Sequence, residues 1–336
     1  MNFRTLHYLL TITLLLSLPN LATAKRGIWL DTDQLLGNPK DAPREVDDAI
    51  ALIMILRYHQ QLKLHGISLV TEVDYGYEIT QRVLQHYWAG DAIPVYKGSD
   101  TCGDVGTENE ATRALAAALR KRKLTILAIG PATDVATVLK NHPELGGQIE
   151  EIVFCAGRTP DYPFTLGLER VTVSDYNVDR DPEAFQVILD SGVPMVLSGF
   201  MASESLFFGE TDYEFLAKGD AFEQYLYEQF IPWSKRMKLA FGIMGFVPWD
   251  TTPVGYLTHP KFFKYYEDIP TQLIQKENDA TLPLIKNKKN RQKPYLEASY
   301  DYDSPHKTTF VYRTVLGFEE IVLECLKAEK PFGKGK

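Results

Sequence analysis

The 336-residue sequence is poor in cysteine and has no excess of basic residues. Its only cysteines are Cys102, Cys155 and Cys325, with no C-x-x-C pair; this count disfavours a zinc or thiol-redox centre and allows at most one intrachain disulfide. Lys and Arg number 36 against 44 Asp and Glu, and the resulting net charge of −8 argues against a nucleic-acid partner. The composition therefore favours a small-molecule substrate or a metal site.

Long apolar runs are also missing, apart from one at the N-terminus. Arg4 precedes the apolar run Tyr8–Leu18, and Ala22-Thr23-Ala24 has the A-x-A pattern of a cleavage site. The run is shorter than the roughly 18 residues that a bilayer span requires, and no later segment is long and apolar enough. We therefore predict a signal peptide over residues 1–24, a single domain over residues 25–336, and a periplasmic or secreted protein with no membrane attachment after cleavage.

The rest of the chain alternates short apolar runs with helical patterns. The apolar runs are Gly27–Leu30, Leu64–Val70, Leu124–Ile129, Ile152–Ala156 and Val193–Leu197, and a strand-like Thr308–Val315 follows near the C-terminus. The helical patterns are Asp47–Arg57, Ala111–Lys121, Thr133–Leu139, Pro182–Asp190, Ala221–Lys238 and Phe318–Lys327. Continuous apolar strands that alternate with helices indicate a parallel sheet covered on both faces. We predict an α/β, doubly wound, mostly parallel sheet flanked by helices.

Aspartates gather where the first predicted strand ends. Asp31 and Asp33 follow that strand, and Asp47 and Asp48 open the helix that comes next. Ligands of parallel sheets collect beyond the carboxyl ends of the strands, so these side chains are expected to converge there. Helix capping explains one such Asp, but four converging carboxylates repel one another. A hard cation such as Ca²⁺, which prefers oxygen ligands, would relieve that repulsion.

Two common aspartate motifs do not fit this segment. An EF-hand loop that started at Asp31 would need Gly at its sixth position and Glu at its twelfth, where the chain has Leu36 and Ala42. An aspartate-nucleophile phosphatase would have Thr or Val two residues after Asp33, where the chain has Leu35, and a later Gly-Asp-x-x-x-Asp that is not found.

These aspartates belong to the first of four segments that, in order, resemble the inosine/uridine-preferring nucleoside hydrolases. Asp31–Asp33 and Asp47–Leu52 match the two halves of the opening signature D-x-D-x-G-x-D-D-A-x-A-L. Ala128–Ala136 resembles a G-P-L-T-N-x-A turn, Asp175–Ala184 resembles E-F-N-x-x-x-D-P-E-A, and Trp249–Pro253 resembles a late H-D-P segment. The resemblance implies the fold predicted above and a nucleosidase activity on ribonucleosides, and it leaves a homo-oligomer open.

The resemblance also implies roles for particular residues. The expected Ca²⁺ ligands are Asp33, Asp48, Asp250 and the backbone carbonyl of Ile129. Asp33 is also the expected catalytic base, which takes a proton from the metal-bound water. The residues expected to bind substrate are Asp47 and Asn177 on the ribose hydroxyls, Glu169 and Asp175 on the ribose 5′ side, and Trp249 next to the base.

The chain departs from the family pattern in two places. Asp33 and Asp47 are fourteen positions apart where the pattern has four, so the segment Leu35–Glu45 must loop out. Trp249 stands where the family has a His, and an indole cannot supply a titrating proton to the leaving base. Two alternatives therefore stay open: an exported Ca²⁺-dependent nucleoside- or ribose-binding protein with little turnover, and a hydrolase of another ribosyl compound.

Overall fold

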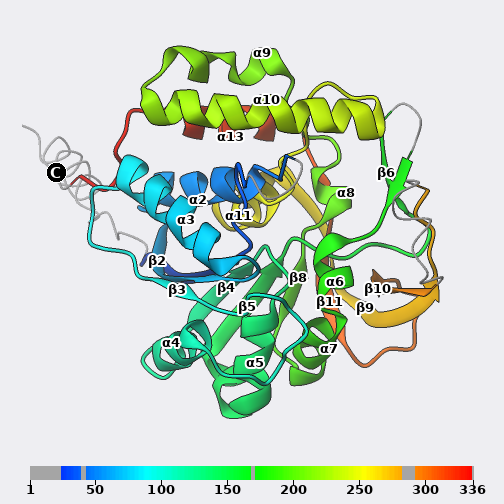
Figure 1. The fold of residues 1–336 in the computed structure, drawn as a ribbon. Helices are drawn as coiled ribbons and strands as arrows, with labels where there is room; N and C mark the ends of the chain where they lie inside the picture. Colours follow the sequence, from blue (N-terminus) through cyan, green and yellow to red (C-terminus); the bar gives the residue numbers. More distant parts are fainter. Residues whose placement is uncertain (1–23, 39–42, 168–170, 282–291, 335–336) are drawn as a thin grey trace, which may run out of the picture.

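A mixed sheet forms the centre of the molecule (Figure 1). The structure is a computed structural model that describes residues 24–38, 43–167, 171–281 and 292–334. Within these residues the sheet has nine strands in the order β10-β9-β11-β8-β5-β4-β1-β2-β3. Strands from β11 to β3 pair in parallel, whereas β9 is antiparallel to both β10 and β11. The predicted mostly parallel α/β fold is confirmed.

The strands of the sheet are β1 (Arg26–Thr32), β2 (Leu62–Leu69), β3 (Val95–Lys97), β4 (Leu124–Ala128), β5 (Ile149–Phe154), β8 (Met195–Leu197), β9 (Phe263–Glu277), β10 (Gln292–Ala298) and β11 (Lys307–Thr314). A separate antiparallel hairpin is formed by β6 (Phe164–Leu166) and β7 (Val171–Val173). β4 is wholly buried and β1 is buried from Ile28 to Thr32, so their continuous apolar sequences predicted both strands. The long β9 escaped prediction because much of it is exposed and its sequence is rich in charged residues.

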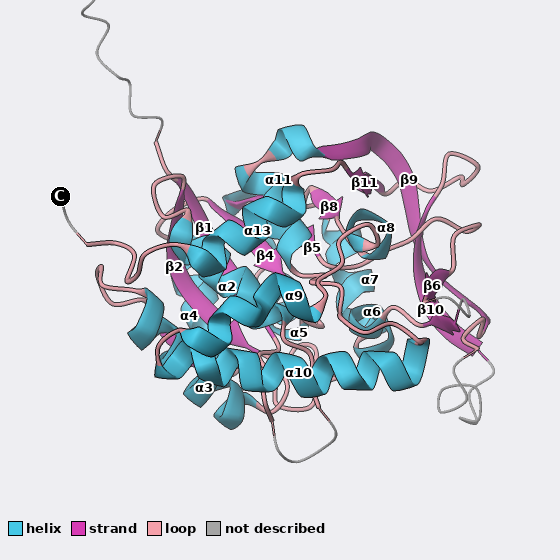
Figure 2. Ribbon diagram, turned by 90° about the horizontal axis from the view of Figure 1, so that it is seen from above, coloured by secondary structure: helices cyan, strands magenta, loops and turns pink. Residues whose placement is uncertain are grey.

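Helices cover both faces of the sheet (Figures 1 and 2). One face packs against α2 (Asp47–Arg57), α3 (Val73–Tyr87), α11 (Thr251–Thr258) and α13 (Phe318–Lys327), with α9 (Glu210–Tyr213) and α10 (Ala221–Phe241) forming an outer layer. The other face packs against α4 (Glu110–Leu119), α5 (Thr133–Asn141) and α7 (Pro182–Ser191). Two short helices, α6 (Tyr176–Arg180) and α8 (Phe200–Ser203), follow β7 and β8.

Helix α2 begins and ends at the predicted residues, and the reason is its burial. Its first ten residues, including Asp47 and Asp48, are buried. A helix that is apolar on every side gains stability only when it is enclosed between other elements, here α3, α11, α13 and the sheet. The apolar body of α2 thus fixes the position of the two carboxylates in its first turn.

Several predictions are not tested by the residues that the structure describes. Residues 1–23 and Glu169 lie outside them, so the signal peptide and the role of Glu169 stay predictions, as does the single-domain organisation of residues 25–336. Among the described helices, none has the length and hydropathy needed to cross a bilayer. Cys102, Cys155 and Cys325 are all free thiols.

Candidate active site

The connections of the sheet reverse direction at β1. The chain runs from β1 to β2 and β3 on one side, and then returns to β4, β5 and β8 on the other. Side chains that follow the carboxyl ends of β1 and β4 therefore lie at a topological switch point, where α/β folds bind their ligands. The segment after β1 carries Asp33, and Ile129 and Gly130 follow β4.

Three carboxylates meet at this point. Asp47, Asp48 and Asp250 each offer an oxygen, and these oxygens lie within 4.8 Å of one another. All three side chains are buried, and they come from the start of α2 and from the residue before α11. The long insertion between Asp33 and Asp47 is therefore compatible with a position of Asp47 and Asp48 next to Asp250.

The surroundings of the three carboxylates determine their charge. Burial, and after it repulsion from the neighbouring carboxylates, holds the pKa of Asp47 and Asp250 well above the usual value. Burial also raises the pKa of Asp48, to about 6, although the Thr32 hydroxyl donates a hydrogen bond to it. Within the described parts of the chain, Oδ1 of Asp47 is buried and has no hydrogen-bond partner. Buried carboxylates with raised pKa values and an unsatisfied oxygen are the donor set that a hard cation would stabilise.

Asp33 lies beside this group but is not one of its three members. Burial, and then repulsion from Asp48, raises the pKa of Asp33 well above its usual value. Its position is constrained by the chain that follows β4, because a Cβ placed on Gly130 would approach Oδ1 of Asp33 to 2.9 Å. The expected fourth ligand, the carbonyl of Ile129, accepts a hydrogen bond of 3.0 Å from Nδ2 of Asn177. A carbonyl oxygen has two lone pairs, so this bond leaves one free.

Asn177 and Asp175 are held by the strand ends next to them. Nδ2 of Asn177 also donates to the carbonyl of Cys155 at 3.0 Å, so one amide bridges the ends of β4 and β5. Oδ2 of Asp175 accepts the Gly157 amide at 2.7 Å, and its other oxygen caps α6 by accepting the Val178 amide at 3.4 Å. Burial raises the pKa of Asp175 to about 6, against the effect of these two amides.

Trp249 precedes Asp250 and is half-buried against the apolar core. Its indole Nε1 is buried and, among the residues that the structure describes, has no hydrogen-bond partner. The backbone carbonyl of Trp249 accepts hydrogen bonds from the hydroxyls of Ser203 and Thr252, both at 3.2 Å. The residue is thus fixed in place beside the acidic group.

The sequence prediction did not include several residues that support the site. Thr32 donates to Asp48, Gly157 donates to Asp175, and Arg158 is almost completely buried beside them. A charged residue four positions after the end of β5, just after the apolar run Ile152–Ala156, is the signal that marks Arg158, because a buried Arg requires partners nearby. The sequence indicates a role for Thr32 only weakly. Side chains alternate along a strand, so the Thr32 side chain lies on the opposite face of β1 from that of Asp31.

Comparisons with known proteins agree with this arrangement. The family model described as "Inosine-uridine preferring nucleoside hydrolase" matches residues 28–306, so the chain belongs to that family. The pyrimidine-specific ribonucleoside hydrolase RihA of Salmonella paratyphi A is 30% identical over 164 residues, which are 47% of this chain and 50% of the relative. RihA of Citrobacter koseri is equally similar over the same length. The aligned part of the chain thus spans about half the length of these curated relatives.

Two solved structures share the fold. A purine-preferring ribonucleoside hydrolase from Gardnerella vaginalis superposes with a TM-score of 0.68 at 15% identity, covering 90% of this chain and 98% of that one. An inosine-uridine preferring nucleoside hydrolase from Bacillus anthracis gives a TM-score of 0.65 at 14% identity, with 90% and 99% covered. The structural similarity extends over nearly the whole of both solved chains.

Proposed function

We propose that the protein hydrolyses the N-glycosidic bond of ribonucleosides, releasing the free base and ribose. The observation that carries the proposal is the meeting of Asp47, Asp48 and Asp250 at the switch point of the sheet, with Asp33 beside them. Membership of the nucleoside hydrolase family supports the same reaction. The substrate is a small molecule, and the base that it carries is left open.

The acidic group fits Ca²⁺, with Asp33, Asp48, Asp250 and the Ile129 carbonyl as the proposed ligands. Three buried carboxylates offer oxygens, the donors that this hard cation prefers, and the one thiol beside them, Cys155, stays protonated because burial raises its pKa well above the usual value. When bound, the cation would supply charge that orients the ribose hydroxyls and makes a water more acidic. Burial, and then repulsion among the carboxylates, raises the pKa of Asp47 and of Asp250, and a bound cation would offset both effects.

Proton transfer, charge stabilisation and substrate binding are assigned to the protein's own residues. Asp33 accepts the proton of the attacking water, and the carboxylates around it stabilise the positive charge that grows on the sugar as the glycosidic bond breaks. Oδ1 of Asp47, which has no hydrogen-bond partner among the described residues, is proposed to bind a ribose hydroxyl. Asn177 is proposed to bind a ribose hydroxyl as well, supported by its hydrogen bond to the Ile129 carbonyl at the end of β4. Asp175, and Glu169 in the part outside the described residues, are proposed for the ribose 5′ side.

We further propose that the enzyme is exported, with residues 1–24 removed, and acts in the periplasm or outside the cell. The apolar segment with its A-x-A site supports this location. Mass determination of the protein recovered from a periplasmic or culture fraction tests it directly, since a chain that retains residue 1 would contradict the proposal.

The activity is tested by incubating the purified mature chain with a panel of ribonucleosides and Ca²⁺ and measuring free ribose. Ribose release that stops on chelation and returns with Ca²⁺ is expected. The 2′-deoxy analogues should bind about 1–3 kcal/mol more weakly, because a buried polar site would lose a partner.

A binding protein with little turnover is the second candidate, favoured by Trp249 in place of a His. In that case ribonucleosides would raise the melting temperature in the presence of Ca²⁺ without release of ribose. The two readouts together therefore separate the enzyme from the binding protein.

A further inference from the structure

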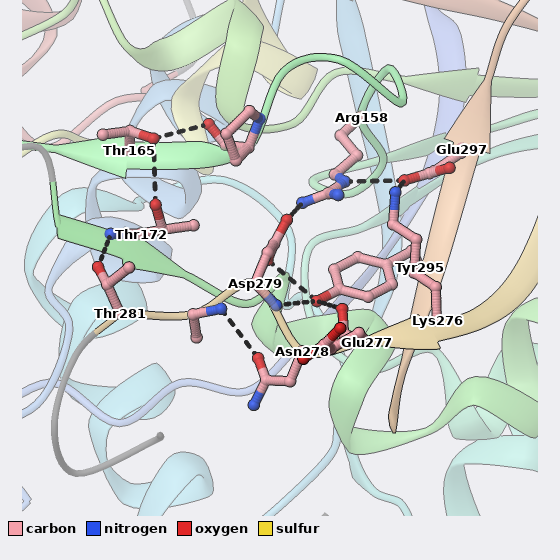
Figure 3. Close-up of polar contacts among 12 residues, drawn as sticks. Arg158, Thr165, Thr172, Lys276, Glu277, Asn278, Asp279, Thr281, Tyr295 and Glu297 are labelled. Carbon is pink, nitrogen blue, oxygen red and sulfur yellow. Dashed lines mark hydrogen bonds and ion pairs between the residues drawn. The ribbon is translucent and has the colours of Figure 1, made fainter. Parts of the chain in front are cut away.

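Arg158 is a buried cation that lies just outside the group of carboxylates described above. Its side chain is 3% exposed, and it follows β5 at the same edge of the sheet as the site. Nε donates to Oε1 of Glu297 at 3.1 Å and Nη1 donates to Oδ2 of Asp279 at 2.7 Å (Figure 3). The guanidinium also lies 4.2 Å from the ring centre of Tyr295.

The backbone of Arg158 is joined to β10 as well. Its amide donates to the Leu296 carbonyl at 3.0 Å, and its carbonyl accepts the Ala298 amide at 2.9 Å. Residue 158 is therefore fixed to β10 by two main-chain bonds and to Glu297 on that strand by its side chain. The partner carboxylate is completely buried and also binds Lys276 and the Tyr302 hydroxyl, so Glu297 has little freedom to move.

Two routes lead from Arg158 to the proposed substrate site. The first passes through the preceding residue, Gly157, whose backbone amide donates a hydrogen bond of 2.7 Å to Oδ2 of Asp175. The second runs through Asp279, which is also held by the Tyr295 hydroxyl at 3.0 Å. Two residues further on, the Thr281 amide donates to the Thr172 carbonyl of β7 at 3.0 Å. The Thr172 amide donates to the Thr281 hydroxyl at 2.7 Å (Figure 3).

We propose that Arg158 is a positioning residue that fixes Asp175 and strand β7 relative to the acidic centre. It does so by joining the loop after β5 to the β9–β10 hairpin, which otherwise belongs to the antiparallel end of the sheet. Lys293 of β10 makes a further link, since it pairs with Asp179 on α6, the helix that carries Asn177. The inference rests on the proposed function for its kinetic consequence but not for its structural one.

These contacts require a guanidinium group, which has several nitrogen donors in one plane. Two carboxylates on different segments bind different nitrogens of one planar group, and the same plane stacks on an aromatic ring. A lysine carries a single ammonium at the end of a flexible stem and cannot hold both carboxylates in this geometry. Arg158→Lys therefore keeps the buried positive charge and removes the connection.

The experiment compares Arg158→Lys and Asp279→Asn with the unaltered mature chain. Asp279→Asn leaves the bond between Arg158 and Glu297 in place and weakens only the route to β7, so it stays informative if Arg158→Lys fails to fold. Arg26→Lys is the matched control, because Arg26 pairs with Glu151 in a partly exposed contact away from Asp175. Hydrogen–deuterium exchange is measured at the amides of Gly157, Thr172 and Thr281.

Exchange of the Gly157 and Thr172 amides should be faster in Arg158→Lys, and exchange of the Thr172 and Thr281 amides faster in Asp279→Asn. Kinetically, KM for a ribonucleoside should rise roughly tenfold in Arg158→Lys with kcat changed less, the size of effect that follows the loss of one or two charge-assisted hydrogen bonds. The 5′-deoxyribonucleoside should show a smaller rise in KM, because it lacks the group nearest Asp175.

Unchanged exchange at these amides in both variants would overturn the proposal, and so would equal rises in KM for the two substrates. If the unaltered chain releases no ribose from any nucleoside, the proposed function fails, but the exchange measurement still decides whether Arg158 positions Asp175.

Discussion

The backbone amide of Asp250 donates a hydrogen bond of 3.3 Å to Oδ2 of Asp47, although the two residues are 203 positions apart. This bond joins the start of α2 to the residue that precedes α11 and uses one oxygen of a carboxylate whose other oxygen has no partner in the described chain. The two helices thus bring together carboxylates that would otherwise repel each other, and a cation between them is the simplest compensation.

Removal of divalent metal should destabilise the protein. Ca²⁺ that binds only the folded state at about 100 times its dissociation constant adds about 2.7 kcal/mol, so chelation should lower the melting temperature by several degrees and Ca²⁺ should restore it. Calorimetry of Asp250→Asn should show little of this Ca²⁺-dependent increase, whereas the exposed Asp91→Asn should keep it. Equal melting temperatures of the chelated and Ca²⁺-loaded protein would contradict the metal site.

Stability of the metal-free protein should fall as the pH rises. Burial raises the pKa of Asp48 to about 6, so between about pH 4 and that value the folded state binds more protons than the unfolded state. The free energy of unfolding then decreases with rising pH in this window, by on the order of 2 kcal/mol for this group. Asn at position 48 cannot bind this proton. Without metal, the free energy of unfolding of Asp48→Asn relative to that of the unaltered chain should therefore increase from pH 4.5 to about pH 7.

In saturating Ca²⁺ at neutral pH, Asp48→Asn should instead be less stable than the unaltered chain, since the variant would lose a ligand. A difference between the two proteins that stays constant with pH would contradict a pKa of about 6 for Asp48.

Gly130→Ala should damage the site through a direct clash. The new Cβ would lie 2.9 Å from both Oδ1 of Asp33 and Cγ2 of Val70, and 3.0 Å from the backbone nitrogen of Asp33. Displacement of this kind costs about 1–3 kcal/mol and would move the carboxylate proposed as base. Ca²⁺ titration and ribose release should both be impaired, whereas Gly147→Ala, with nothing within 4 Å, is the control. Unimpaired Ca²⁺ binding and turnover in Gly130→Ala would place Asp33 outside the site.

Replacement of the proposed base should stop the reaction whatever the leaving group. Asp33→Ala is expected to lower kcat by about 10²–10⁴-fold for both inosine and a nitrophenyl riboside, because neither substrate can replace a base that acts on water. Steady-state ribose release from the two substrates is the measurement. Retention of activity on either one would assign the base to another carboxylate of the group.

Trp249 should limit the choice of leaving group. An indole has no titrating proton, so the unaltered chain is expected to cleave the nitrophenyl riboside, whose leaving group needs no protonation, faster than inosine. Trp249→His should raise the rate on inosine, since general acid catalysis contributes about 10²–10⁴-fold. Equal rates of the unaltered chain on both substrates would mean that another residue supplies the proton.

The sequence predicted the central architecture correctly where burial leaves a periodic pattern. The boundaries of α2 and α13 were right because each has a dense apolar pattern. The long β9 and the hairpin β6–β7 were missed, since a half-exposed antiparallel strand has no continuous apolar run and a three-residue strand is too short for any period. The helices α3 and α11 and the strands β3 and β10 were not predicted either, and α11 is the helix that directly follows Asp250.

The sequence by itself determined the family and the parallel core of the sheet with several of its covering helices, and it predicted which aspartates would bind a cation, because these follow from local spacing and from the buried faces of single elements. Only the tertiary structure decided that Asp250 reaches Asp47, that Asn177 binds the carbonyl of Ile129, and that Arg158 ties the loop after β5 to Asp279. Each of these contacts joins residues far apart in the chain, and the orientation of a side chain toward such a partner is set by the packing of whole helices and strands, which no local pattern encodes.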